Sequence, residues 1–153
     1  MPSSSKPAPN VQPANLVERL FNRAFGWLIA LGLAPANFYL LDVKGRKSGR
    51  TYSTPVDLLA YGGRDYLVAP RGRTQWVRNA EASATVTLRQ KGSSRRYTVR
   101  EIPPHERAPI LKAYLDAYRA QVQRFFPVEA GSPVEAFEPL VERYPAFELR
   151  AQG

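Results

Sequence analysis

The sequence contains no cysteine and only one histidine, His105. The lack of cysteine excludes disulfides, a thiolate nucleophile and cysteine-ligated metals. Chains without disulfides are typical of a reducing cytoplasm, so we expect a cytoplasmic protein. A single histidine leaves almost no material for a histidine-rich zinc site or a Ser-His catalytic pair. We therefore predict no metal site and no assignable catalytic residue, and expect any chemistry to belong to a bound cofactor.

Acidic residues are scarce in the middle of the chain. Residues 44–100 contain thirteen lysines and arginines but only three acids, whereas the whole chain has 22 bases, 13 acids and a formal charge of +9. The excess is therefore local, and it indicates an anion-binding site rather than a generally basic surface. Nucleic acid, an anionic membrane and an anionic cofactor are the partner classes that such a charge admits.

Long hydrophobic runs are also few. Residues 1–14 are rich in proline and serine and predict a disordered tail, followed by one domain over residues 15–153. Asn15 and Glu18 resemble a capping box at the start of a helix whose later part, residues 24–36, is apolar. That run is too short to span a bilayer, although it could be a secretory leader. We favour a helix packed on the sheet, with an apolar end facing either a membrane or a substrate.

The rest of the chain alternates between strand and turn signals. We expect strands at residues 38–44, 51–61, 64–70, 84–90, 95–102 and 146–150, and helices at residues 75–83, from Pro103 to about Phe126, and after an N-cap at Ser132. Antiparallel strands with helices grouped at both ends predict an α+β domain, built around a small β-barrel.

The segment Gly45–Gly49, "GRKSG", places basic residues in a turn between two expected strands. Its glycines allow a sharp bend that presents backbone N–H groups to an anion, while Arg46 and Lys47 add charge and Ser48 adds a hydroxyl. It is not a P-loop, because the glycine-to-lysine spacing differs and no helix follows. A solvated hairpin turn is the alternative interpretation.

A second basic loop, "PRGRT", leads into the expected short helix that contains Trp76, Arg78 and Asn79. The free N–H groups at the start of this helix could bind an anionic group. Equally, Trp76 could belong to the core and Arg78 to the solvated surface.

Together, "GRKSGRTYSTPV", "YLVAPRG" and "WVRN" resemble the deazaflavin-dependent nitroreductase family of split β-barrel oxidoreductases, related to the pyridoxamine-phosphate-oxidase-like flavin-binding fold. The resemblance implies a site for the deazaflavin coenzyme F420, with its phosphate at the basic turn and its ring along the following strand. The implied cofactor-binding residues are Arg46, Lys47, Ser48, Gly49, Arg50, Tyr52, Ser53, Thr54, Pro55, Val68, Ala69, Pro70, Arg71, Gln75, Trp76, Val77, Arg78 and Asn79. Tyr52 departs from the pattern, because some relatives carry arginine there.

The function that this resemblance implies is transfer of hydride from reduced F420 to an organic acceptor such as a quinone, nitro compound or enone. FMN is the alternative cofactor. A carrier of cofactor or lipid, and a binder of single-stranded nucleic acid that stacks bases on aromatic residues, are the alternative functions. Because no nucleic-acid motif is present, we predict a small-molecule acceptor and no nucleic-acid partner. The chain is expected to be a monomer or a homodimer.

Overall fold

The computed structural model describes residues 37–152. The tail and the helix expected within residues 1–36 therefore lie outside the described residues, and the domain boundary at residue 15 stays a prediction. Within the described part, no helix is both long enough and apolar enough to cross a membrane.

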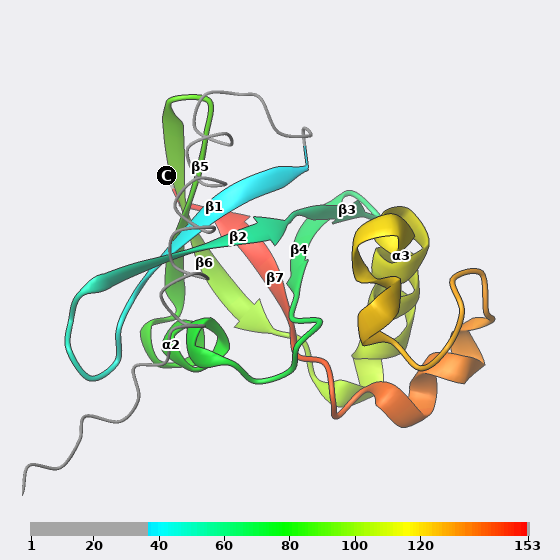
Figure 1. Ribbon diagram of the computed structural model, residues 1–153. Helices are drawn as coiled ribbons and strands as arrows, with labels where there is room; N and C mark the ends of the chain where they lie inside the picture. The colour runs from blue at the N-terminus through cyan, green and yellow to red at the C-terminus, as the bar shows by residue number, and fades with distance from the viewer. Residues whose placement is uncertain (1–36, 153) are drawn as a thin grey trace, which may run out of the picture.

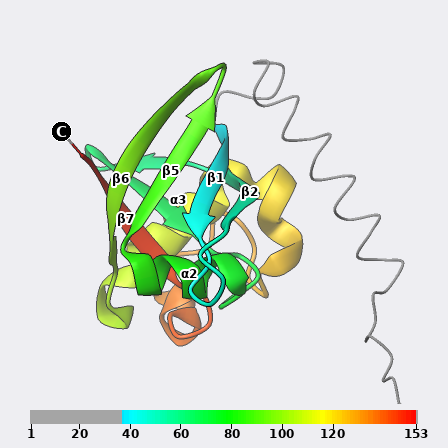
Figure 2. The same cartoon turned by 90° about the vertical axis from the view of Figure 1, so that its left-hand side faces the viewer.

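One seven-stranded antiparallel sheet forms the body of the described chain (Figure 1). Its strands, in spatial order, are β2 (Thr51–Asp57), β1 (Phe38–Lys44), β5 (Thr85–Gln90), β6 (Ser93–Glu101), β7 (Ala146–Ala151), β4 (Arg64–Val68) and β3 (Leu59–Tyr61). The two edge strands, β2 and β3, are separated in the chain by Leu58 alone, so the sheet must curl until its edges meet. The turned view in Figure 2 shows this curvature. The predicted α+β fold with a curled, barrel-like sheet is confirmed.

The expected single strand over residues 51–61 is wrong, because the chain crosses from one sheet edge to the other at Leu58. The Leu58 amide extends the β1–β2 register by one residue and donates to the Asn37 carbonyl at 2.8 Å, and the Tyr118 hydroxyl donates to the Leu58 carbonyl at 2.5 Å. Pro55 lies in edge strand β2, where a residue without an N–H group is tolerated.

Three helical regions flank the sheet. Helix α2 (Gln75–Ser83) has the bounds that the sequence predicts, whereas the long helix ends earlier, as α3 (Pro104–Val122) followed by the 3₁₀ turn η1 (Gln123–Phe125). The helix expected after Ser132 is instead the 3₁₀ helix η2 (Val134–Leu140), capped by Pro133. Ser132 belongs to the preceding turn, where its amide donates to the Glu129 carbonyl at 3.1 Å.

The sheet has two faces and each has its own core. Inward-facing side chains such as Leu41, Val86 and Phe147 pack with Val77 and Ala80 of α2, so α2 closes one end of the curled sheet. On the outer face α3 covers β3, β4 and β7, and η2 packs against α3. Figure 1 shows α3 on that side and α2 beneath β1 and β5. The outer face of β5 and β6 carries threonines and charged residues, whereas that of β1 carries Asp42 and Lys44 beside the buried Leu40.

Asp57 lies where the two sheet edges meet, and its carboxylate is partly buried. Burial raises its pKa to about 6, although the hydrogen bond donated by Asn37 at 2.7 Å opposes this rise. The folded state therefore holds the Asp57 proton more tightly than the unfolded state. The stability that this proton binding contributes is complete below about pH 4 and is lost as the pH rises through about 6.

We predict that Asp57→Asn raises the melting temperature at pH 7 and changes it little at pH 4, because the amide keeps an acceptor for Asn37 without the buried charge. Asp116→Asn is the matched control of opposite sign. Burial raises the pKa of Asp116, but hydrogen bonds from Lys112 and from the Gly131 amide outweigh that effect and lower it. Its replacement should therefore cost stability at pH 7 and little at low pH. Calorimetry across the pH range tests both variants. If the two melting temperatures changed with pH in the same way, the opposite pKa shifts of Asp57 and Asp116 would be contradicted.

Candidate functional site

The basic turn joins β1 to β2 and has a defined shape. The Gly45 amide donates to the Arg50 carbonyl at 2.7 Å, and the Gly49 amide donates to the Gly45 carbonyl at 3.0 Å. Gly49 has a φ of 76°, which glycine adopts without the steric cost of a side chain. The Ser48 hydroxyl accepts the Arg50 amide at 3.1 Å, so this side chain also fixes the turn.

The turn is docked on α2 through two carboxamides, of which Asn79 makes the larger number of contacts. The Oδ1 atom of Asn79 accepts both the Arg46 backbone amide at 3.0 Å and the Arg46 guanidinium Nη1 at 2.8 Å. The same Nη1 donates to Gln75 Oε1 at 2.9 Å. Asn79 is only 4% exposed, so its two bonds to Arg46 are partly sheltered from competing water, whereas the bond to Gln75 is exposed. Residues thirty-three positions apart in the chain thereby form one unit, and Arg46 contributes to that structure as well as to the local charge.

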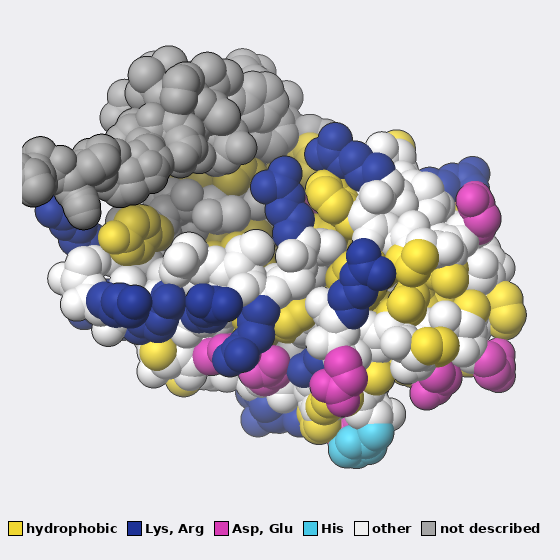
Figure 3. Space-filling model, turned by 60° about the horizontal axis from the view of Figure 1, so that its bottom comes forward, with side chains coloured by type: hydrophobic (Ala, Val, Ile, Leu, Met, Phe, Trp, Pro, Cys, Tyr) yellow, Lys and Arg dark blue, Asp and Glu magenta, His cyan; other side chains and the backbone are white. Residues whose placement is uncertain are grey.

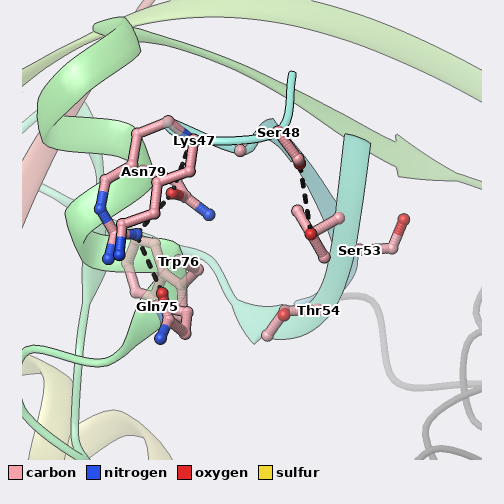
Figure 4. Close-up of a pocket in the computed structure, with 10 residues that line it drawn as sticks. Lys47, Ser48, Ser53, Thr54, Gln75, Trp76 and Asn79 are labelled. Atoms are coloured by element: carbon pink, nitrogen blue, oxygen red, sulfur yellow. Dashed lines mark hydrogen bonds between the residues drawn. The ribbon is translucent and has the colours of Figure 1, made fainter. Parts of the chain in front are cut away.

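A cavity of about 380 Å³ lies between the turn, β2 and α2. The described residues that line it are Gly45, Arg46, Lys47, Ser48, Tyr52, Ser53, Thr54, Gln75, Trp76 and Asn79. Figure 4 shows Gln75, Trp76 and Asn79 of α2 on one side and Ser48, Ser53 and Thr54 on the other. Its volume is within the usual range of small-molecule sites.

The N-terminus of α2 opens toward this cavity. Thr74, the N-cap residue, makes no side-chain capping bond, and the first turn contains no acidic residue. The first helical hydrogen bond is donated by the Arg78 amide to the Thr74 carbonyl at 3.2 Å. The preceding amides of Gln75, Trp76 and Val77 therefore have no partner within the helix, and the helix dipole adds partial positive charge there. This end of the cavity favours an anion.

Two aromatic side chains line the cavity. Trp76 is held by packing against Phe147, with ring centroids 5.7 Å apart. Tyr52 is 49% exposed, and its hydroxyl lies 3.3 Å from the Ser48 hydroxyl. The Tyr52 ring rests on Gly45, where an added Cβ atom would meet Tyr52 Cε2 at 2.6 Å. The cavity thus has an anion-binding side and aromatic surface suited to a planar ring.

The structure brings nine of the eighteen predicted residues to this cavity, and their contact with a ligand stays a prediction. The other nine do not line it: Gly49, Arg50, Pro55, Val68, Ala69, Pro70, Arg71, Val77 and Arg78. Val68, Ala69 and Val77 are core residues, and the Arg71 guanidinium lies 5.6 Å from the ring centroid of Phe125. Gly45 was missed as a site residue, although a glycine opening a basic turn was a signal that could have identified it.

Several cations in residues 44–100 are neutralised by acids. Arg89 forms two hydrogen bonds with Asp42, at 2.6 and 3.1 Å, and Arg64 and Arg100 both pair with buried Glu148. Near the end of α2, the Arg73 hydrogen bond lowers the pKa of Glu81. By contrast, Lys47 forms no side-chain hydrogen bond or ion pair with any described residue. Figure 3, which views the end of the molecule near α2, shows lysine and arginine side chains in a row across part of this surface.

The curled antiparallel sheet, with a cavity at the turn–helix junction, is an α+β domain of the split-barrel-like type. The sequence profile of the F420H(2)-dependent quinone reductases matches residues 18–132. The chain belongs to this family, which confirms the predicted resemblance and makes the protein an F420-dependent type of oxidoreductase. The family description specifies a quinone rather than a nitro acceptor.

Solved structures share the fold. A structure described as a domain-swapped dimer is 20% identical with a TM-score of 0.54, covering 91% of this chain and 100% of its own. An F420-H2 dependent reductase (FDR-A) is 22% identical with a TM-score of 0.50, and the match covers 75% of this chain and 95% of the reductase. A heme binding protein from Mycobacterium smegmatis is 16% identical with a TM-score of 0.50, and the match covers 80% of this chain and 49% of that protein. Because proteins with different ligands share this fold, the fold alone does not identify the ligand.

No curated protein sequence matches this chain closely enough to count as a relative. The family profile and the geometry of the cavity therefore carry the functional argument.

We predict that Gly45→Ala reshapes the cavity through Tyr52. The backbone at Gly45 does not require a positive φ, but the new Cβ atom must displace the Tyr52 ring. Gly45→Ala should destabilise the wild-type protein by about 1 kcal/mol, as overpacking does. In a Tyr52→Ala background the same change should be nearly neutral. Chemical denaturation of the four proteins gives the coupling energy, and additive effects would show that Gly45 and Tyr52 are not in contact.

Proposed function

We propose that the cavity between the β1–β2 turn and α2 binds coenzyme F420 and that the protein passes hydride from the reduced coenzyme to a quinone-like acceptor. One observation carries this proposal: a single cavity in a member of this family contains Lys47, which has no ion-pair partner among the described residues, together with a helix N-terminus and aromatic surface. These features suit a ligand that has an anionic group on a planar ring.

The residues present fit such a coenzyme. Lys47, the Ser48 hydroxyl and the free amides at the start of α2 would hold the phosphate through charge-assisted hydrogen bonds. Trp76 and Tyr52 offer aromatic faces for the ring. The chain's one histidine, His105, lies at the exposed start of α3 and outside the cavity, so it offers no axial ligand for a haem there.

The role of this chain would be to bind, orient and shield. When bound, the reduced coenzyme supplies the hydride, and reduction of a quinone to a quinol also requires one proton. No carboxyl group and no histidine lines the cavity among the described residues. We therefore infer that the proton comes from solvent or through the Ser48 and Tyr52 hydroxyls. Positioning the acceptor against the ring supplies the main catalytic advantage.

Turnover with a defined acceptor tests this function. Reduced F420 mixed with the protein and menadione should lose its reduced state much faster than without protein, as followed by the absorbance of oxidised F420. A nitroaromatic acceptor and an enone, run in parallel, identify the acceptor class. Tight binding of FMN with no affinity for F420 would contradict the proposal and favour the flavin alternative. Binding of F420 without turnover of any acceptor would indicate a carrier.

We predict that Lys47→Gln weakens F420 binding about tenfold, equivalent to about 1.4 kcal/mol, because it removes one charge-assisted contact to the phosphate. Lys91→Gln removes an equal charge from the β5–β6 turn, away from the cavity, and should change the affinity little. Fluorescence titration measures both. Neither substitution removes a side-chain interaction in the described structure, so melting temperatures should stay close to wild type. Equal weakening in both variants would show that the protein's overall charge, not Lys47, attracts the coenzyme.

A further inference from the structure

A second groove has a volume of about 460 Å³. It lies on the other face of the β1–β2 hairpin from the cavity that we propose binds F420, which is called the F420 cavity below. The strand register establishes this separation. Val43 pairs with Tyr52, and Val43 faces the inner core, so Tyr52 faces inward toward the F420 cavity. The next pair, Lys44 and Thr51, faces outward because side chains alternate along a strand. Both of these outward residues line the second groove.

The groove has a floor of hydroxyl groups between two cations. Its centre is β5, whose outward residues Thr85 and Thr87 lie between β1 and β6. Lys44 of β1 lies on one side, and Arg96 of β6 lies on the other, directly opposite Thr87. Neighbouring strands are about 4.8 Å apart, and Lys44 is two residues along β1 from Asp42, the residue level with Arg96, so the backbones at the two cations are separated by roughly 12 Å. Long side chains from both sides can therefore reach one ligand above the floor.

These two cations are not neutralised within the described residues. Asp42 is the one acid that lines the groove, and it already accepts two hydrogen bonds from Arg89 and one from Ser53 at 2.6 Å. The side chains of Lys44 and Arg96 are exposed and form no hydrogen bond or ion pair with a described residue. Two like charges facing one polar floor attract an anion.

We propose that this groove binds a small oxyanion carrying two negative charges, a phosphate ester or a dicarboxylate. Lys44 and Arg96 would each contribute a charged donor, and the Thr51, Thr85 and Thr87 hydroxyls would contribute neutral donors. Among residues 37–152 no aromatic side chain lines the groove, and the neighbouring Tyr97 is buried in the inner core, which disfavours a base-stacking nucleic acid as the ligand. The inference is independent of the function proposed for the F420 cavity.

Titration of the 15N-labelled protein with inorganic phosphate and, separately, with succinate tests this site. We expect saturable shifts of the Thr85 and Thr87 amides with at least one of the two anions at physiological salt. Lys44→Gln combined with Arg96→Gln should weaken this response at least about tenfold. Arg95→Gln is the matched control, because Arg95 is adjacent in β6 but lies over the Tyr97 ring, at 5.8 Å. A response to phosphate alone identifies the ligand as a phosphate ester, and a response to succinate alone identifies it as a dicarboxylate.

The same spectra separate this groove from the F420 cavity. Phosphate bound at the F420 cavity shifts the Ser48 and Trp76 amides, and Lys47→Gln should remove those shifts while leaving those of Thr85 and Thr87. The absence of saturable shifts at Thr85 and Thr87, or shifts that the Lys44–Arg96 double variant leaves unchanged, would overturn the proposal. The F420 affinity of the double variant should equal that of wild type, so failure of one site does not imply failure of the other.

Discussion

The site depends on one buried carboxamide oxygen. Asn79 Oδ1 accepts both the backbone amide and the guanidinium of Arg46, and thereby fixes the β1–β2 turn to α2. Without this contact the turn would be a solvated hairpin with mutually repelling cations. With it, Lys47 is held beside the N-terminus of a helix that is itself anchored in the core through Val77 and Ala80. Local repulsion is tolerated because a sheltered hydrogen-bond pair offsets it.

The closure of the sheet places the two sides of the cavity. β2 follows the turn and ends at the seam, where the chain passes through Leu58 to the opposite edge strand. Hydrogen bonds that Leu58 donates to Asn37 and accepts from Tyr118 hold the crossing point, and Asp57 lies partly buried next to it. The cavity thus lies along β2, which is held at one end by α2 and at the other by the junction of the two sheet edges at Leu58. This arrangement provides the rigid support that a binding site requires.

Local signals in the sequence predicted much of this structure. Helix α2, strand β1 and the turn were placed correctly, because capping, alternation and glycine position are decided by neighbouring residues. The break at Leu58 could not be predicted in this way, since it follows from which strands become the edges of the sheet. Likewise, Val68 and Val77 lie on either side of the polar loop at residues 70–74 but face the core, and only the packing of α2 and β4 decides that orientation.

The charge of the central segment shows most clearly where sequence reasoning needed the fold. Residues 44–100 carry a large excess of cations, yet three acids outside that window neutralise several of them: Asp42 pairs with Arg89, and Glu106 and Glu148 pair with Arg100. Since strand pairing brings these acids in, a count along the chain overestimates the free charge. Among the cations without a side-chain partner in the described residues, Lys47 lines the inner cavity, while Lys44 and Arg96 line the outer groove, so the charge left after this pairing lies on both faces of the sheet.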